Sequence, residues 1–237
     1  MNTTVFGQPV GAPVPEWTAR ARASRVVITG NYCRIEPVDV ERHARSLFDA
    51  YAEAPDDRDW TYLFAERPTD ADACRAYAAR LAASEDPLHY AVVDLASGRA
   101  VGTAALMRME PVHGVIEVGS ITYAPRLQRT RAGTEAMYLL MRYAFDDLGY
   151  RRYEWKCDSL NAPSLAAAER YGFTFEGIFR QAIVYKGRNR DTAWFSITDR
   201  EWPAVRAGFE AWLRPENFDE RGAQRVSLAE LRNRPRD

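Results

Sequence analysis

Three alternating apolar segments follow one another between residues 89 and 124, and they constrain the fold more than any other part of the chain. The segments are HYAVVDL, AVGTAALMRM and VIEVGSITYA, and the turn sequences ASGR and PVHG separate them. Short segments of period-two alternation joined by glycine-containing turns predict an antiparallel meander. We therefore expect a sheet at the centre of the fold.

The segment after this meander changes to a helical period. Apolar residues recur at three- and four-residue spacing up to a glycine stop at Gly149, namely Met137, Leu140, Met141, Ala144, Phe145 and Leu148. The strand YEWKC follows, then a short helix after NAPS that ends at Gly172, then FEGIFRQAIVYK and DTAWFSIT joined at GRN as a long hairpin. A strand–helix–strand crossover thus interrupts an otherwise antiparallel sheet.

Two further helices are expected before the meander. The segment YCRIEPV alternates like a short strand, and Asp39 can cap a helix with one apolar face. Thr69 and Asp72 form a capping-box-like start for the second helix. The polar loop between them contains APDDRDW.

Composition bounds the class of protein. The chain has 237 residues, 46% of them hydrophobic, with a formal net charge of −1, so one globular domain is expected and nucleic acid is not the expected main partner. We divide it into an extended arm (1–25), a domain (26–213) and a polar tail (214–237). No apolar run suits a signal peptide or a membrane span, and three scattered cysteines without metal-ligand spacing suit a reducing cytoplasm.

The helix after the meander begins with an unusual turn, QRTRAGTEA. A helix N-terminus leaves backbone N–H groups unpaired and carries partial positive charge, so it can bind an anion. Gly133 allows close approach, Thr130 and Thr134 add hydroxyl groups, and Arg129 and Arg131 add charge. A merely solvated basic turn is the alternative, but cations there oppose the helix dipole unless an anion is present. The turn therefore predicts a phosphate site.

The order of elements, with QRTRAGTEA and the downstream NAPSLAAAERYGF, resembles the GNAT superfamily of acyl-CoA-dependent N-acetyltransferases, closest to its ribosomal-protein N-terminal acetyltransferase branch. The resemblance covers roughly residues 32 to 198. It implies an α/β (α+β) fold in which a twisted, mostly antiparallel sheet has helices on both faces and splays open between the family's fourth and fifth strands. Arg131 departs from the family pattern, which has glycine at that position.

The resemblance also implies the residues that contact acetyl-CoA, the expected co-substrate. The loop amides cradle the pyrophosphate, the opened strand contacts the acetyl and pantetheine groups, and the start of the later helix contacts the coenzyme arm. These positions are Ile121, Thr122, Tyr123, Gln128, Arg129, Thr130, Arg131, Ala132, Gly133, Thr134, Asn161 and Ser164. For Asn161 and Ser164, simply starting a helix is an equal alternative.

Candidate groups for chemistry are fewer. Glu117 aligns with the family's strand-borne glutamate and is the candidate base, the alternative being a solvent-facing residue on an alternating strand. Ala168 stands where many members of the family have a tyrosine that acts as the general acid. Its absence leaves Ser164, Ser120 or water to protonate the thiolate. The three histidines and Cys157 suggest structural roles, and no metal site is expected.

An acceptor pocket is expected from the loop DDRDWTYLF and the strand TAWFSI. Asp59 would attract a cationic amine, while Trp60, Tyr62 and Trp194 would pack on its apolar part, unless these groups are only solvated or in the core. We thus expect transfer of acetyl to a protein N-terminal α-amine or a small amine. The alternative is a coenzyme A-binding regulator without catalysis. A homodimer through the last hairpin and helix is left open.

Overall fold

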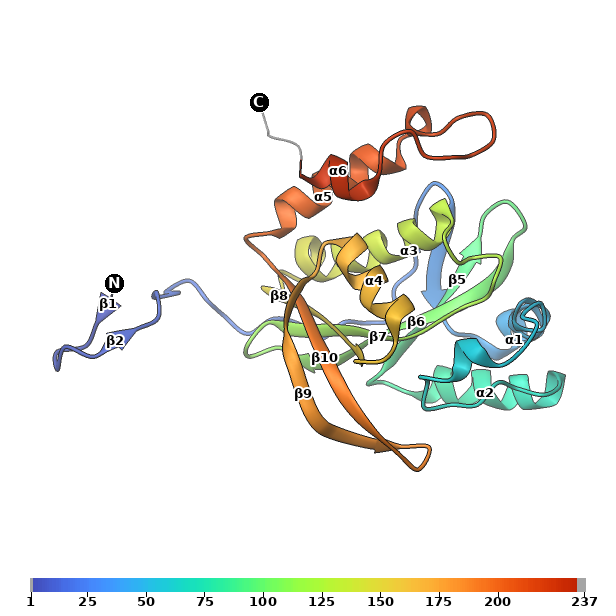
Figure 1. Cartoon of the computed structure of the whole chain (residues 1–237), viewed down its shortest axis with the longest axis horizontal. Coiled ribbons are helices and arrows are strands. Elements are labelled where there is room, and N and C mark those ends of the chain that lie inside the picture. The colour runs from blue at the N-terminus through green and yellow to red at the C-terminus, as the bar shows by residue number, and fades with distance from the viewer. Residues whose placement is uncertain (1, 234–237) are drawn as a thin grey trace.

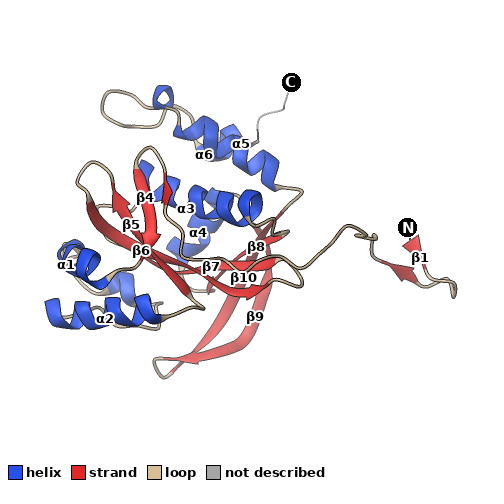
Figure 2. Ribbon diagram, turned by 180° about the vertical axis from the view of Figure 1, so that it is seen from behind, coloured by secondary structure: helices blue, strands red, loops and turns tan. Residues whose placement is uncertain are grey.

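The computed structural model describes residues 2–233 and contains an eight-stranded sheet between two groups of helices (Figures 1 and 2). The strand order is β3-β4-β5-β6-β7-β8-β10-β9, and every neighbouring pair is antiparallel except β7 with β8. The strands are β3 Ile28–Thr29, β4 Cys33–Pro37, β5 Leu88–Asp94, β6 Arg99–Glu110, β7 Val115–Tyr123, β8 Arg152–Asp158, β9 Thr174–Tyr185 and β10 Arg188–Thr198. The expected mostly antiparallel sheet with one crossover is confirmed.

Helices cover both faces of this sheet (Figure 2). Alternation along β5 divides the core, because Tyr90 and Val92 pack with α3, whereas Ala91 and Val93 pack with α1 and α2. α4 and α5 join the first of these cores. The helices are α1 Val40–Tyr51, α2 Ala71–Ala83, α3 Arg131–Arg142, α4 Ala162–Tyr171, α5 Trp202–Leu213 and α6 Leu228–Arg232.

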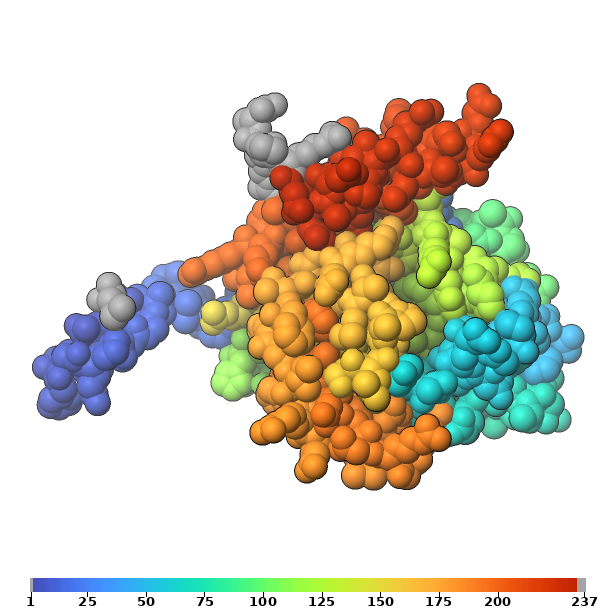
Figure 3. Space-filling view, in the orientation of Figure 1, coloured from blue at the N-terminus to red at the C-terminus, as the bar shows by residue number. Residues whose placement is uncertain are grey.

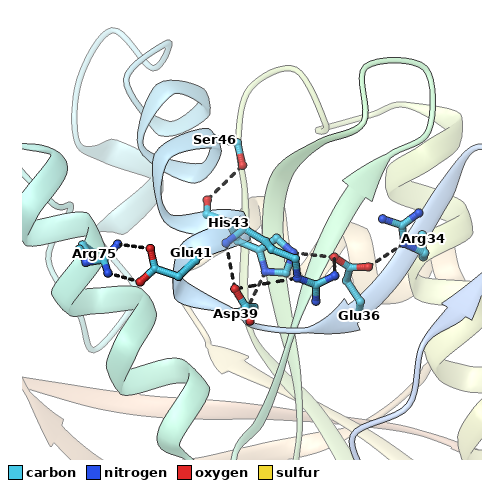
Figure 4. A network of polar contacts seen from close by, with 8 residues as sticks. Arg34, Glu36, Asp39, Glu41, His43, Ser46 and Arg75 are labelled. Atoms are coloured by element: carbon cyan, nitrogen blue, oxygen red, sulfur yellow. Dashed lines mark hydrogen bonds and ion pairs between the residues drawn. The ribbon is translucent and has the colours of Figure 1, made fainter.

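The start of α1 is fixed by a network of polar contacts (Figure 4). Asp39 caps the helix as expected, since its side chain accepts from the Arg42 amide. The Asp39 amide donates to His43 Nδ1, so His43 Nε2 carries the proton that it donates to Glu36 Oε1 at 2.6 Å. Burial alone would raise the pKa of Glu36, but hydrogen bonds from Arg34 and His43 hold it below its ordinary value. His43 therefore has a structural role, as expected.

The cap of α2 differs from the sequence prediction. Asp70, not Thr69, is the N-cap residue, and its Oδ1 accepts from the Ala73 amide at 2.8 Å. Thr69 instead donates its hydroxyl hydrogen to Asp70. The predicted capping box was one residue out of register, because either residue can act as an N-cap and the backbone geometry selects between them.

The last hairpin has a tighter turn than predicted. β10 begins at Arg188, three residues earlier than the predicted strand at Asp191. The reversal needs only Lys186 and Gly187, whose φ angles of 48° and 69° both lie in the left-handed region. Two such residues form the compact turn that matches the twist of paired strands. The loop GRN is therefore mostly strand.

The N-terminal arm is anchored at its base and extends away from the body (Figures 1 and 3). Trp17 Nε1 donates to the Val112 carbonyl at 2.8 Å, and Arg20 Nε donates to the Gly149 carbonyl at 2.9 Å. Beyond this anchor, β1 (Asn2–Thr3) and β2 (Pro9–Val10) pair as a small hairpin. Within residues 2–233, no helix has the length and apolar character that a membrane span requires.

The polar tail docks on the domain as far as it is described. α6 packs against α5 and α4. Arg232 Nη1 donates to the carbonyls of Glu169 and Arg170 at 3.4 and 3.0 Å, where α4 ends. The Glu169 carbonyl also accepts from the Gly172 amide, whereas the Arg170 carbonyl has no other donor among the described residues, so the guanidinium caps this end of the helix. Residues 234–237 of the predicted tail lie outside the described part.

Candidate active site

The sheet forks between its two parallel strands. β7 and β8 pair only from Val115 to Val118, and beyond this point β7 remains paired with β6 alone. A bulge marks the fork, because the β6–β7 register shifts between Thr103 and Ala105 and Ser120 adopts a φ of 47°. The three strand residues expected to contact the cofactor lie beyond the fork, namely Ile121, Thr122 and Tyr123. The fork is the splayed opening predicted from the sequence.

The turn before α3 presents a helix start with free backbone donors. Thr130 is the N-cap, because its Oγ1 accepts from the Gly133 amide at 3.0 Å and donates to the Leu127 carbonyl at 2.7 Å. Among the described residues, the amides of Arg131 and Ala132 have no acceptor. Two free N–H groups at the positive end of a helix suit an anion.

Gly133 is required for this turn to close. A Cβ at Gly133 would lie 2.5 Å from the Leu127 carbonyl oxygen, a backbone atom that cannot move aside. Tyr123 ties the turn to the opened strand, because its hydroxyl donates to the Gly133 carbonyl at 3.3 Å. The absence of a side chain at Gly133 thus allows the Leu127 carbonyl and Tyr123 to approach the helix start. These contacts hold the end of β7 against the start of α3.

The side chain of Arg131 packs on two aromatic rings, Tyr32 and Phe218. Its guanidinium lies 4.2 Å from the ring centre of Phe218 in the tail and 5.2 Å from that of Tyr32. Glu135 fixes the loop that carries Tyr32 by accepting its backbone N–H at 2.7 Å. The departure from glycine at Arg131 is therefore accommodated by turning the side chain onto two aromatic rings, while the backbone amide stays at the helix start.

A second arginine lies beside this turn. Arg170, on α4, donates to Thr134 Oγ1 at 3.2 Å, and its guanidinium lies 5.0 Å from the ring centre of Trp212. Among the described residues, no carboxylate pairs with Arg129, Arg131 or Arg170. Sequence reasoning missed Arg170, because only packing of α4 beside α3 brings it to the turn.

The loop between α1 and α2 lies against both the turn and the segment just before α4. Gln128 Nε2 donates to the Tyr123 carbonyl at 2.9 Å and to Asp59 Oδ2 at 3.1 Å. Tyr62 donates its hydroxyl to the Leu160 carbonyl at 3.0 Å. Asp59 was expected at the acceptor amine, but in this structure its carboxylate bonds to the predicted phosphate turn.

The other two aromatic candidates have different surroundings. Trp60 is only 2% exposed and meets Tyr51 and Tyr77 edge-on, so its ring belongs to the core beneath α1 and α2. Trp194 on β10 stacks on Phe179, with ring centres 4.3 Å apart. Lys156 Nζ lies 3.9 Å from the Trp194 ring centre. Among the four acceptor candidates, Trp194 is therefore the one that contacts Lys156.

Glu117 is buried among charges. It is 4% exposed, and it lies on the sheet face opposite α3 because Ile116 and Val118 pack with that helix. Its Oε2 lies 2.8 Å from Lys156 Nζ and 3.4 Å from Arg108 Nε. The alternative of a solvent-facing carboxylate is thus wrong, because Lys156 and the neighbouring strands cover it.

A second carboxylate shares the same ammonium. Glu154 Oε2 lies 2.6 Å from Lys156 Nζ, and Glu154 sits directly opposite Glu117 in the parallel register of β7 and β8. Sequence reasoning missed both Lys156 and Glu154. The signal was present in YEWKC, because two charges at alternate positions of a buried strand must share one face and need partners there.

Burial sets the proton affinity of Glu117. It raises the pKa of Glu117 above its ordinary value, and the Lys156 ammonium and Arg108 guanidinium counteract part of this rise. No described residue donates a hydrogen bond to Glu117 Oε1, which lies 3.5 Å from the position of a Cβ on Gly119. A carboxylate of raised pKa with one free oxygen beside the fork is suited to accept a proton.

The start of α4 lies on the sheet face opposite Glu117, because Ser164 contacts Trp155, which packs in the core with α3. Asn161 caps this helix by accepting from the Ser164 amide at 3.2 Å, so its helix-starting role is confirmed. Ser164 Oγ accepts from Trp155 Nε1 at 3.0 Å, and the Ser164 hydroxyl also lies within hydrogen-bonding reach of the Cys157 thiol. Ala168 is fully buried in the core. Burial raises the pKa of the Cys157 thiol, consistent with a structural role.

Two other features of the described residues lie apart from the fork. A cavity of about 430 Å³ lies at the base of the arm and is lined by Trp17, Arg20, Phe145, Tyr150 and Trp202 among others. It contains none of the predicted site residues. Among residues 2–233, no group of histidine, cysteine and acidic side chains could hold a metal ion.

Comparison with known proteins identifies the family. Residues 34–174 match the family model described as "Acetyltransferase (GNAT) domain". The chain belongs to this family of acetyltransferases and is an acyltransferase. The forked sheet agrees with the fold that the resemblance to this family implied.

Individual relatives agree with this assignment. A crystal structure described as a GCN5-related N-acetyltransferase from Brucella melitensis is 48% identical, has a TM-score of 0.91 and is covered completely by 93% of this chain. A GNAT-family structure from Chromobacterium violaceum is 42% identical, with a TM-score of 0.75, over 82% of this chain and 97% of that one. The curated relative "Putative ribosomal N-acetyltransferase YdaF" of Bacillus subtilis is 28% identical over 71% of this chain and 90% of its own length. The similarity to the ribosomal-protein branch expected from the sequence is confirmed.

Proposed function

We propose that this protein transfers an acetyl group from acetyl-CoA to a primary amine by direct attack of the amine. The observation that carries the proposal is the position of Glu117. Its free Oε1 lies at the fork of a sheet whose opened strand leads to a helix start with two free amides. Proton acceptor, opening and anion site thus lie along one path.

The residues present fit the pyrophosphate of acetyl-CoA. The amides of Arg131 and Ala132 would bind phosphate oxygens at the start of α3. Arg129 and Arg170 have no carboxylate partner among the described residues and are near enough in the fold to add charge. Residues Ile121 to Tyr123, which have lost β8 as a neighbour, would hold the pantetheine arm through their backbone. The bound thioester supplies the activated acetyl group.

Glu117 and Lys156 have different roles toward the acceptor amine. Glu117 Oε1 would take the proton from the amine as nitrogen attacks, directly or through one water. Lys156 stays bonded to Glu117 Oε2 and Glu154 Oε2, so it orients Glu117 and balances the negative charge of the pair. The C–N bond forms as the C–S bond breaks, and neither carboxylate forms a covalent bond.

Protonation of the departing sulfur falls to the α4 side of the fork. The Ser164 hydroxyl, held by its bond from Trp155, is the first candidate to pass a proton to the sulfur. Ser120, at the bulge, and water are the other candidates. Because the hydroxyl can be reprotonated from solvent, no second acid is required.

Acetyl transfer can be tested directly. Purified protein is mixed with acetyl-CoA and a panel of peptides with free α-amines, lysine analogues and small amines, while released thiol is measured. The proposal expects amine-dependent thiol release and an acetylated amine by mass spectrometry. Release no faster than hydrolysis with every amine would contradict it.

One observation favours a second function. Ala168 is buried at the position where many family members have a tyrosine that acts as the general acid. A coenzyme A-binding regulator would keep the phosphate turn without catalysis. Calorimetry with acetyl-CoA and the acetyl-transfer assay together separate the two functions, because both proteins would bind the ligand but only the enzyme would acetylate an amine.

A further inference from the structure

Arg190 is a buried cation without a carboxylate partner. It lies on β10, is 8% exposed, and its Nε is buried without an acceptor. Its guanidinium lies over the faces of Phe64 and Tyr185, whose ring centres are 5.9 and 5.8 Å from the guanidinium carbon. Buried charges in proteins are ordinarily paired and hydrogen-bonded. The buried Nε donor of Arg190 therefore has no acceptor among the described residues.

The cations around Glu117 on this face of the sheet have carboxylate partners. Lys156 contacts Glu117 and Glu154, Arg152 contacts Glu154 and Glu176, and Arg108 contacts Glu117. Within residues 2–233, Arg190 forms no ion pair within 4.0 Å. The contrast is within one sheet face, so it does not reflect a general shortage of carboxylates.

The nearest carboxylate along the register is already engaged. Asp158 sits opposite Thr192, two residues from Arg190. Its Oδ2 accepts from the Tyr185 hydroxyl and its Oδ1 from the Leu160 amide, both at 2.9 Å. Asp158 thus offsets part of the local charge but leaves the guanidinium donors unfilled.

A second orphan polar group lies beside Arg190. Thr192 is 3% exposed, and its Oγ1 has no hydrogen-bond partner. Arg190, Thr192 and Trp194 are alternate residues of β10 and therefore share a face. Trp194 belongs to the Lys156 and Glu117 cluster. The two unfilled groups thus lie on the same face as the proposed acceptor site, further along the strand.

We infer that Arg190 and Thr192 form a binding site for a carboxylate carried by the acceptor. The inference rests on the proposed function, because the amine of the same acceptor would lie at Glu117. Four residues of strand separate Trp194 from Arg190, about 13 Å at the rise of a β-strand. An extended peptide covers that span in about four residues, whereas a free amino acid does not. The acceptor is therefore a polypeptide with an acidic side chain near its free N-terminus.

The walls of this site suit an extended acidic peptide. The polypeptide would pass Trp194 and present its acidic side chain to the guanidinium, beside the ring of Phe64. Phe64 is 65% exposed and lies on the loop that Lys186 holds through the Trp60 carbonyl at 2.9 Å. A guanidinium binds a carboxylate through two parallel hydrogen bonds, which a lysine cannot reproduce.

The test compares two peptides, Ser-Ala-Ala-Glu-Ala and Ser-Ala-Ala-Gln-Ala, as acceptors with acetyl-CoA. The wild type should show a KM roughly tenfold to a hundredfold lower for the glutamate peptide, the range expected for a hydrogen-bonded charge pair. R190M should abolish this preference with little change in kcat. R188M is the matched control, because Arg188 is an exposed arginine on the same strand, and it should keep the preference. Equal KM values for both peptides in the wild type, or a preference that survives in R190M, would overturn the inference.

A binding measurement separates this inference from the proposed function. Calorimetry without acetyl-CoA should show the glutamate peptide binding to wild type and R188M but not to R190M. Failure of acetyl transfer alongside such binding would contradict the proposed function and support the carboxylate site. Acetylation of other amines without any binding of the glutamate peptide would do the reverse. Circular dichroism shows whether R190M is folded, and R190K, which keeps the charge without the paired donors, should give an intermediate preference.

Discussion

Lys156 Nζ lies between Glu117 Oε2 and Glu154 Oε2, at 2.8 and 2.6 Å, and all three side chains are buried. The parallel pairing of β7 and β8 places the two carboxylates opposite each other. Lys156, two residues after Glu154 and on the same face of β8, supplies the ammonium. Two buried carboxylates so close would repel strongly without that cation. The arrangement holds Glu117 in place and leaves Oε1 toward the fork.

Removal of the base should reduce the chemical step. Glu117→Gln keeps the shape of the side chain but cannot take a proton, so kcat for acetyl transfer should fall by about 10²–10⁴-fold. The KM for acetyl-CoA should change little, because Glu117 lies on the face opposite α3. E176Q, an acidic residue paired with Arg152 on the same side of the sheet, is the control and should retain activity. An E117Q enzyme with unchanged kcat would exclude Glu117 as the base.

The acid side of the pH–rate profile should report Glu117. Activity should fall as the pH decreases through the pKa of Glu117, which burial places above the ordinary glutamate range. Lys156→Met removes the main group that lowers this pKa, so the acid limb of kcat/KM should move to higher pH. R108M removes a more exposed partner at 3.4 Å and should move the limb less, in the same direction. An identical limb in wild type and K156M would contradict this assignment.

The same substitution should also change stability. In K156M, two buried carboxylates lose their shared partner, a loss of about 3–5 kcal/mol of unfolding free energy at neutral pH. Without the ammonium, burial raises the folded pKa of Glu117 further above its unfolded value, so the native state binds more protons. The deficit should therefore shrink as the pH falls below that folded pKa, because protonation removes the buried charge of Glu117. Urea unfolding of both proteins across this pH range measures it, and a deficit that grows on acidification would contradict it.

Gly133 tests the phosphate turn sterically. Gly133→Ala places a Cβ 2.5 Å from the Leu127 carbonyl oxygen, so the turn must open and the protein should lose about 1–3 kcal/mol of stability. The KM for acetyl-CoA should rise, because the amides of the helix start move with the turn. G11A is the control, since nothing lies within 4 Å of a Cβ at that glycine of the arm. Wild-type binding of acetyl-CoA by G133A in calorimetry would argue against the turn as the anion site.

The N-cap of α3 offers a chemical test of the same turn. Thr130→Ala removes the acceptor of the Gly133 amide and should cost about 1 kcal/mol of stability. It should also weaken acetyl-CoA binding, because the helix start loses its fixed geometry. S227A removes the N-cap of α6, far from the fork in sequence, and should cost similar stability without changing acetyl-CoA affinity. Equal affinities of T130A and S227A would contradict the role of the turn.

Local patterns in the sequence predicted the parts of the site that local geometry creates. The alternation around Glu117 and the glycine and threonine of the α3 turn each depend on a few adjacent residues. The resemblance to the acetyltransferase family then supplied the fork, which no periodicity in β7 shows by itself. The predicted N-cap at Thr69 was wrong by one residue. Two neighbouring residues that can both cap a helix cannot be told apart before the backbone is known.

The parts that the sequence did not predict depend on contacts between distant elements. Lys156 reaches Glu117 only because the crossover through α3 sets the register of β8 on β7. The Arg131 side chain packs on Tyr32 and Phe218, which come from distant parts of the chain. Trp60 enters the core and Asp59 bonds to Gln128 because of how one irregular loop folds. Arg190 shows no local signal, since its significance is the missing partner.

A crystal structure with bound coenzyme A tests the central claim most directly. The account predicts phosphate oxygens within hydrogen-bonding distance of the Arg131 and Ala132 amides, with the sulfur at the fork between Glu117 and Ser164. A pyrophosphate bound away from the start of α3, or a sulfur on a different edge of the sheet, would contradict it.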